Sequence, residues 1–372
     1  MDALRALALL GVFIVNAMGY PSAPNYPMPL GIPLPADSML AIGLNGVLSA
    51  FVQGKAYPLL CFLFGYSLYS MAHAYGESVS QVKYLLKKRY KKLLVIGILH
   101  GLFVYFGDVL TTYAICGFVV TRWVAHRPAR LIKIFRTLTI FVAIEIVLLL
   151  LLSFILWIDT NKMDIDMVQS MSILMTYSTF LKLNASSYIF GVLNTLVLLP
   201  ILLWLTVAGV LTRRFRLLSL RPVAIYFWQR NLRPWHFTLA LLFNIVMGVF
   251  IVKTQSTDEL NKLSAIGLIN MFAGIWLVAS ALAIVVRHWH KVKYLPPWIH
   301  WLAPAGKHTL AMYLTLSLAL MLSGGAFLNI QVSTVVRFVI VVVAWICAIL
   351  LAKHATSLGL RDPIASWISA KN

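Results

Sequence analysis

Charged residues are scarce in this sequence, and acidic residues are the scarcest of them. Only 11% of the residues are charged, and 11 residues are Asp or Glu against 31 that are Lys or Arg. A water-soluble domain has about a quarter of its residues charged, so this composition excludes an ordinary soluble globular protein. Apolar residues make up 61% of the chain. We therefore expect a polytopic membrane protein.

Cysteine is also nearly absent, and the first apolar run lacks the cleavage pattern of a signal peptide. Cys61, Cys116 and Cys347 each lie within an apolar run, and their spacing matches neither a disulfide framework nor a metal site. We expect all three to be small buried hydrophobic side chains. A proline-rich loop follows the first apolar run at 3–19, without a cleavage pattern of small residues. We therefore expect this run to be the first span and not a signal peptide.

Apolar runs of membrane-spanning length recur from one end of the chain to the other. They predict an all-α polytopic protein, forming a single integral membrane domain over 1–372. Its N-terminal five-span half, 1–157, would carry the site, and the C-terminal five-span half would cover 186–352. A shorter apolar stretch at 39–53 predicts an interfacial or re-entrant helix. About ten transmembrane helices of roughly 20 residues are expected, at 3–19, 56–76, 91–107, 109–125, 133–157, 186–211, 236–253, 263–286, 306–325 and 333–352.

The net charge of +20 is unevenly distributed along these predicted spans. With the N-terminus in the cytoplasm, most Lys and Arg residues fall in inner loops, including 83–92 and the basic connector 212–235, while the outer loop 158–185 has few. This distribution predicts that both termini are cytoplasmic. The inner loops would contact anionic lipid headgroups, so the basic charge does not indicate nucleic-acid binding.

One predicted hairpin contains ionisable side chains inside apolar sequence. In "GILHGLFVYFGDVLTTYAICGFVV" a sharp turn is expected at 107–109, with Asp108 at its apex. His100 would then lie about 10 Å further down the preceding helix, near mid-membrane. Because histidine exchanges protons near neutral pH, His100 is a candidate general base or proton carrier, with Asp108 as its partner. The alternative is a structural histidine that is hydrogen-bonded between helices.

A second candidate segment is "FVQGKAYPLLCFLFG". Gly54 and Pro58 predict a broken helix, a common feature of membrane binding sites. Lys55 and Tyr57 in this segment are candidate substrate-binding residues. The alternative for Lys55 is a structural ion pair with Asp108.

Polar residues on other predicted helices complete the candidate set. Asp2 and Arg5 lie on one side of the first helix and are candidates for substrate binding, or for an intrahelical pair that anchors the helix end. Asn16, near the outer end of the same helix, would hydrogen-bond a neighbouring span or a ligand. Glu145, in "FVAIEIVLLLL", is isolated in apolar sequence and is a candidate proton carrier or interhelical hydrogen-bond donor.

Several segments together resemble the YeiB-like family of bacterial inner-membrane proteins. They are "DALRALALLGVFIVN", "GKAYPLLCFLFGYSL", "ILHGLFVYFGDVLTTYAICG", "APAGKHTLAMYLTLSL" and "GLRDPIASW". The chain departs from the family pattern at Ala6, Lys307, His308 and Met312. The resemblance implies a bacterial inner-membrane location. It also carries over, as the polar positions of the family pattern, Asp2, Arg5, Asn16, Lys55, His100, Gly101, Gly107 and Asp108.

The layout is also similar to transmembrane acyltransferases of the heparan-glucosaminide acetyltransferase type. This similarity implies transfer of an acyl group from a cytosolic thioester, such as acyl-CoA, to a small-molecule or lipid-linked acceptor. The catalytic histidine of those proteins lies in the first outer loop, which has no histidine here, so His100 would replace it. The alternative function is a proton-coupled transporter or exporter of an anionic or lipid-like solute, with His100, Asp108 and Glu145 as its proton relay and Lys55 as its anion ligand. The sequence shows no metal-site or cofactor motif.

Overall fold

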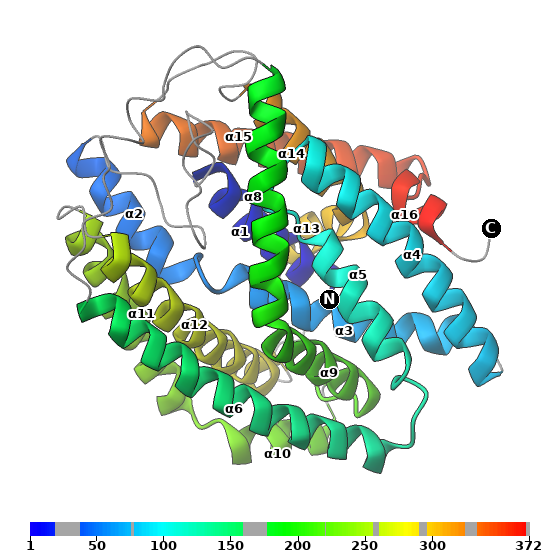
Figure 1. Cartoon of the computed structure of the whole chain (residues 1–372). Coiled ribbons are helices and arrows are strands. Elements are labelled where there is room, and N and C mark those ends of the chain that lie inside the picture. The colour runs from blue at the N-terminus through cyan, green and yellow to red at the C-terminus, as the bar shows by residue number, and fades with distance from the viewer. Residues whose placement is uncertain are drawn as a thin grey trace.

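The protein is a bundle of α-helices (Figure 1). The computed structural model describes residues 1–18, 38–75, 78–158, 177–219, 221–255, 260–289, 296–323 and 333–369. Within these ranges the elements are α1 (Asp2–Met18), α2 (Met39–Phe51), α3 (Ala56–Tyr75), α4 (Val79–Phe103), α5 (Leu110–Thr121), α6 (Pro128–Ile158), α8 (Tyr177–Val197), α9 (Leu199–Arg214), α10 (Pro222–Asn231), α11 (Pro234–Gln255), α12 (Leu260–Trp289), α13 (Pro297–Lys307), α14 (Thr309–Ser323), α15 (Thr334–Ser357) and α16 (Pro363–Ile368). The described ranges contain no strand, as the all-α prediction requires.

Five helical segments in the described ranges are long and apolar enough to cross a membrane. They are Met39–Tyr75, Pro128–Ile155, Pro234–Thr254, Ile266–His288 and Thr334–Ser357, and the bent pair α8–α9 would be a sixth. Large apolar side chains such as Phe141 and Leu148 on α6 and Ile340 and Leu351 on α15 are exposed on the outside of the bundle. Such continuous apolar surface is characteristic of lipid contact. The chain is therefore a helical membrane protein.

Helices α1 and α3 lie in the middle of the bundle. α1 packs against α3, α13, α14 and α15, and α3 packs most extensively against α9. Helices α6, α9, α11 and α12 lie on one side of this pair, and α13 to α16 lie on the other (Figure 1). A Cβ atom at Gly65 would overlap the carbonyl oxygen of Thr206, and one at Gly209 would overlap that of Phe62. The glycines therefore allow the α3 and α9 backbones to touch, as small residues do at membrane helix crossings.

Several predicted boundaries were wrong, and each error has a local cause. The expected single span 186–211 is two helices, α8 and α9, bent by 67° at Leu198. Pro200 lies in the first turn of α9, where its ring and missing N–H prevent the preceding helix from continuing. The basic segment 83–92 lies within α4 and not in a loop, and residues 177–185 of the expected loop lie within α8. The basic connector contains a helix, α10, which begins at Pro222.

Two further predictions can be compared with the described residues. The expected helix at 39–53 exists as α2, and a turn joins it to α3 through Gly54, which has a φ of 76°. Cys61 and Cys116 are buried free thiols, as expected, but Cys347 is exposed. This last prediction was wrong because apolar sequence in a membrane helix need not face the protein interior, and α15 has an exposed apolar face.

Candidate active site

His100 and Asp108 form a buried, directly hydrogen-bonded pair. The His100 Nδ1 to Asp108 Oδ1 distance is 2.9 Å, and the two side chains are 3% and 0% exposed. The expected separation of about 10 Å along the helix was wrong, because α4 ends at Phe103 and not at 107. The amides of Val104 and Tyr105 both donate to the carbonyl of His100. The following turn brings Asp108 back to the last turn of α4.

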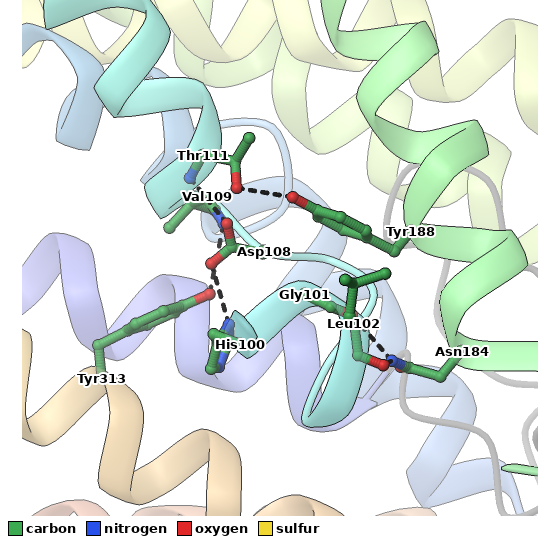
Figure 2. A network of polar contacts seen from close by, with 9 residues as sticks. All are labelled: His100, Gly101, Leu102, Asp108, Val109, Thr111, Asn184, Tyr188 and Tyr313. Carbon is green, nitrogen blue, oxygen red and sulfur yellow. Dashed lines mark hydrogen bonds and ion pairs between the residues drawn. The ribbon is translucent and has the colours of Figure 1, made fainter. Parts of the chain in front are cut away.

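The carboxylate of Asp108 also holds the start of α5. Its Oδ2 atom accepts a hydrogen bond of 2.7 Å from the backbone N–H of Thr111. The first amides of a helix have no partner within the helix, and an aspartate at this position supplies one. Asp108 therefore fixes the geometry of the α4–α5 connection and orients the histidine ring at the same time (Figure 2).

The orientation of the ring determines what His100 can do. An ionised carboxylate accepts hydrogen bonds and donates none, so opposite such a carboxylate Nδ1 is the donor. In a neutral imidazole Nε2 then presents its lone pair. Nε2 is buried and has no hydrogen-bond partner among the described residues. A carboxylate-oriented histidine whose second nitrogen is unused is the arrangement of a general base.

Two tyrosines enclose the pair, and neither was among the candidates predicted from the sequence. Tyr313 of α14 places its ring centroid 5.0 Å from that of His100, and its hydroxyl accepts a 3.4 Å hydrogen bond from the amide of Val109. Tyr188 of α8 shares a 2.9 Å hydrogen bond with the hydroxyl of Thr111. The two rings flank Asp108 from opposite sides (Figure 2).

Helix α8 is fixed to α4 at the same place. The side-chain amide of Asn184 donates to the carbonyls of Gly101 and Leu102, each at 2.8 Å. A Cβ atom at Gly101 would overlap the ring of Tyr188, so this glycine permits the close approach. Asn184 was missed because 177–185 was assigned to a loop. Tyr188 and Tyr313 carry no sequence signal that distinguishes them from the other tyrosines of the chain.

Tyr57 lies against the helix that follows Asp108. Its ring stacks on that of Tyr113 of α5, with centroids 6.1 Å apart and an interplanar angle of 15°. Tyr113 also stacks on Phe64 at 5.1 Å. The candidate substrate-binding residue Tyr57 is therefore connected to the His100–Asp108 pair through α5.

Lys55 forms a separate buried site, and its alternative ion pair with Asp108 is not present. The Lys55 Nζ atom donates to the carbonyl of Ser49 at 2.8 Å and to Asn270 Oδ1 at 2.7 Å. The amide of Asn270 donates to the same Ser49 carbonyl at 3.1 Å. Lys55 thus bonds the C-terminal end of α2 and links the α2–α3 turn to α12. Asp108 is bonded to His100 and Thr111 instead.

The other candidates lie in different places. Asp2 and Arg5 form the expected pair at 2.6 Å, close to the N-terminal end of α1. Asn16 is half-buried near the opposite end of α1, and no hydrogen bond among the described residues joins it to His100. Glu145 is 8% exposed, and neither of its carboxylate oxygens has a hydrogen-bond partner within the described ranges.

Comparison with known proteins finds similarity to two bacterial proteins over part of the chain. A protein of Bacillus subtilis named YxaH and described as uncharacterized is 28% identical over 135 residues, 36% of this chain and 34% of that protein. An uncharacterized 39.9 kDa protein encoded in the amylase 3′ region of Bacillus acidopullulyticus is 32% identical over 123 residues, 32% of each chain. The matched segments span about a third of these relatives. No family model matches the chain.

Proposed function

We propose that the protein is a membrane-embedded acyltransferase in which His100 is the general base. The observation that carries this proposal is the free Nε2 atom of a buried histidine whose Nδ1 is bonded to Asp108 at 2.9 Å. Asp108 keeps the proton on Nδ1, so that Nε2 can accept another. Tyr188 and Tyr313 position this pair through their contacts with Thr111, Val109 and His100.

In the proposed reaction the acceptor bears a hydroxyl or an amine. Its oxygen or nitrogen attacks the carbonyl carbon of a thioester while Nε2 of His100 removes its proton. The tetrahedral intermediate collapses, the carbon–sulfur bond breaks, and the thiolate leaves as a thiol with the proton that His100 held. General-base assistance of this kind contributes about 10²- to 10⁴-fold to a rate.

The basic end of the bundle would receive the thioester donor. Arg5 and Asp2 lie at that end, where Lys and Arg residues of α4 and α9 also gather. Asn16 lies near the C-terminal end of α1, Lys55 lies just before α3 and Tyr57 lies at its start. These positions are at the opposite end of the bundle, as is Asp108, which precedes α5. The proposal therefore places the charged part of an acyl-CoA donor at the basic end, and the acceptor at the His100 end.

The finer topology belongs to the same proposal. We infer about ten spans of roughly 20 residues, counting α1, α4, α5 and α14 as shorter or more polar crossings. We also infer a bacterial inner membrane, with both termini in the cytoplasm. The concentration of basic residues at one end of the bundle supports this orientation, because cytoplasmic loops are enriched in Lys and Arg.

The test is transfer of radiolabelled acetyl and palmitoyl groups from coenzyme A by the purified protein in liposomes of bacterial lipid extract. We expect label to appear in lipid or in added soluble acceptors with the wild type and with Arg230→Gln, an exposed-surface control on α10. His100→Asn should fold and give no transfer above background, because asparagine hydrogen-bonds but is no base. Equal transfer by His100→Asn and the wild type would refute the catalytic role, and absence of wild-type transfer of either acyl group would refute the proposal.

A second function, proton-coupled transport of an anionic or lipid-like solute, is favoured by one observation. Glu145 holds a carboxyl group inside the apolar bundle without a hydrogen-bond partner among the described residues, and such groups commonly carry protons in membrane transporters. Dye-loaded liposomes would reveal solute-dependent proton uptake that Glu145→Gln abolishes. Uptake that persists in Glu145→Gln would exclude this relay.

A further inference from the structure

Two arginines from different helices meet one face of α3 at the basic end of the bundle. Nη2 of Arg5, on α1, donates to Ser67 Oγ at 2.7 Å. Nε of Arg213, on α9, donates to Ser70 Oγ at 2.9 Å. Residues three apart on a helix are neighbours on its surface, with Cβ atoms about 5–6 Å apart. The two guanidinium groups are therefore bonded to neighbouring positions on the surface of α3.

Further contacts fix the planes of the guanidinium groups. Arg213 lies over the ring of Tyr66 at 5.4 Å, and Arg5 Nη1 is bonded to Asp2. Each serine hydroxyl donates its own proton to α3, Ser67 to the carbonyl of Leu63 at 2.7 Å and Ser70 to that of Tyr66 at 3.2 Å. The serine oxygens are consequently oriented to accept from the arginines, and the arrangement is preorganised before any ligand binds.

The protein neutralises the positive charge at this place only in part. Asp2 is bonded to Arg5, but Arg213 has no carboxylate partner within the ranges that the structure describes, and its two Nη groups make no hydrogen bond there. Arg214, the next residue, lies over the ring of Tyr69 and bonds the carbonyl of His126. The unused donors of this half-buried guanidinium are available to a ligand, and its forked geometry fits the oxygens of a phosphate.

We propose that Arg5 and Arg213, held by Ser67 and Ser70, bind a phosphate group at the basic end of the bundle. Asp2 already pairs with Arg5, so Arg213 supplies the larger share of the binding. The phosphate belongs either to a soluble organic phosphate, such as a phosphorylated donor, or to the headgroup of an anionic phospholipid. The first source rests on the proposed function, since the thioester donor would carry the phosphate; phosphate binding itself requires no catalysis.

The test measures binding to the full chain in nanodiscs of phosphatidylcholine, with pyrophosphate as the soluble probe. We expect Arg213→Gln to weaken pyrophosphate binding by about tenfold or more, because a charge-assisted forked contact is lost. Ser70→Ala should weaken it less, since it releases the guanidinium without removing it, and provides a milder variant should Arg213→Gln fold poorly. Arg230→Gln, on the exposed surface of α10, should bind as the wild type does.

A second arm distinguishes the two sources. Nanodiscs that contain phosphatidylglycerol are analysed by native mass spectrometry for lipids retained by the wild type and by Arg213→Gln. Lipid retention that depends on Arg213, without pyrophosphate binding, would identify the lipid headgroup as the source. Pyrophosphate binding that depends on Arg213, without lipid retention, would identify a soluble phosphate. Equal binding of both probes by the wild type, Arg213→Gln and Ser70→Ala, or binding of neither probe by the wild type, would overturn the proposal. His100→Asn should retain wild-type phosphate binding, so that a failed acyltransferase test leaves this result intact.

Discussion

Replacing Asp108 separates its structural contribution from its chemical one. Asp108→Ala removes the acceptor of the Thr111 amide, and the loss of a helix cap costs about 0.5–2 kcal/mol of stability. The substitution also leaves the buried Nδ1 of His100 unpaired, which costs about 1–3 kcal/mol. The free energy of unfolding should therefore fall by roughly 1.5–5 kcal/mol. Both parts of this loss follow from bonds of 2.7 and 2.9 Å on a carboxylate that is 0% exposed.

Asp108→Asn should behave differently. The asparagine carbonyl can still accept from Thr111, so we expect a loss of only about 1 kcal/mol. Its NH₂ group then faces Nδ1 of His100, which must accept, and the ring proton moves to Nε2. The histidine is held in the wrong tautomer, and acyl transfer should fall by about 10²- to 10⁴-fold.

The assay combines thermal unfolding in detergent, followed by tryptophan fluorescence, with the transfer reaction in liposomes. Asp362 provides a matched control, since its buried carboxylate accepts from the amides of Ala311 and Ala365 at 3.0 and 2.8 Å and forms no hydrogen bond or ion pair with a histidine in the described ranges. Asp362→Ala should destabilise the protein as Asp108→Ala does, and Asp362→Asn should leave transfer near the wild-type rate. Full transfer by Asp108→Asn, or an unchanged melting temperature for Asp108→Ala, would contradict the reasoning.

Two further predictions concern packing and exposure. Gly65→Ala should lower the apparent melting temperature strongly, because its Cβ atom would overlap the Thr206 carbonyl oxygen. Gly267→Ala, with no atom within 4 Å of its added Cβ, should have little effect. Equal effects of the two substitutions would contradict the close α3–α9 crossing. A membrane-permeant maleimide should label Cys347 in the folded protein, though slowly because a thiol that faces lipid is rarely ionised. It should leave Cys61 unlabelled until denaturation, because only Cys347 is exposed. Mass spectrometry of peptides checks this result, and rapid labelling of Cys61 would show that the α3 face is open.

The helical class was predictable because it depends on composition and run length. An apolar run of about 20 residues has few alternatives to a helix in lipid, and α6, α11, α12 and α15 fall where such runs occur. The residues at which helices begin and end were less predictable. The apolar run at 91–107 does not show that α4 begins at Val79 and includes the basic segment 83–92. The break at Leu198 was indicated by Pro200, but an apolar run on both sides concealed it.

The candidate site was predictable only in part. His100 and Asp108 stand out because ionisable residues are rare in apolar sequence, and both belong to one connection. Lys55 stood out for the same reason, yet its partner is Asn270 of α12, and no local pattern relates positions so far apart in the chain. Tyr188 and Tyr313 contribute to the site through hydroxyl and ring contacts. Nothing in the sequence distinguishes them from the other tyrosines of the chain.

The two ends of α3 suggest how the proposed sites would share one substrate. About 20 Å of helix separates Tyr57 from Ser70, at roughly 1.5 Å per residue. A phosphate held at Arg213 cannot cross that distance cheaply, because an unpaired charge in the apolar interior is costly. An acyl group has no such penalty, and the stacked rings of Phe64 and Tyr113 lie along the α3–α5 contact between the two ends. A donor with its charged group fixed at the basic end and its acyl group extended toward His100 would therefore satisfy both sites without moving a charge through the bundle.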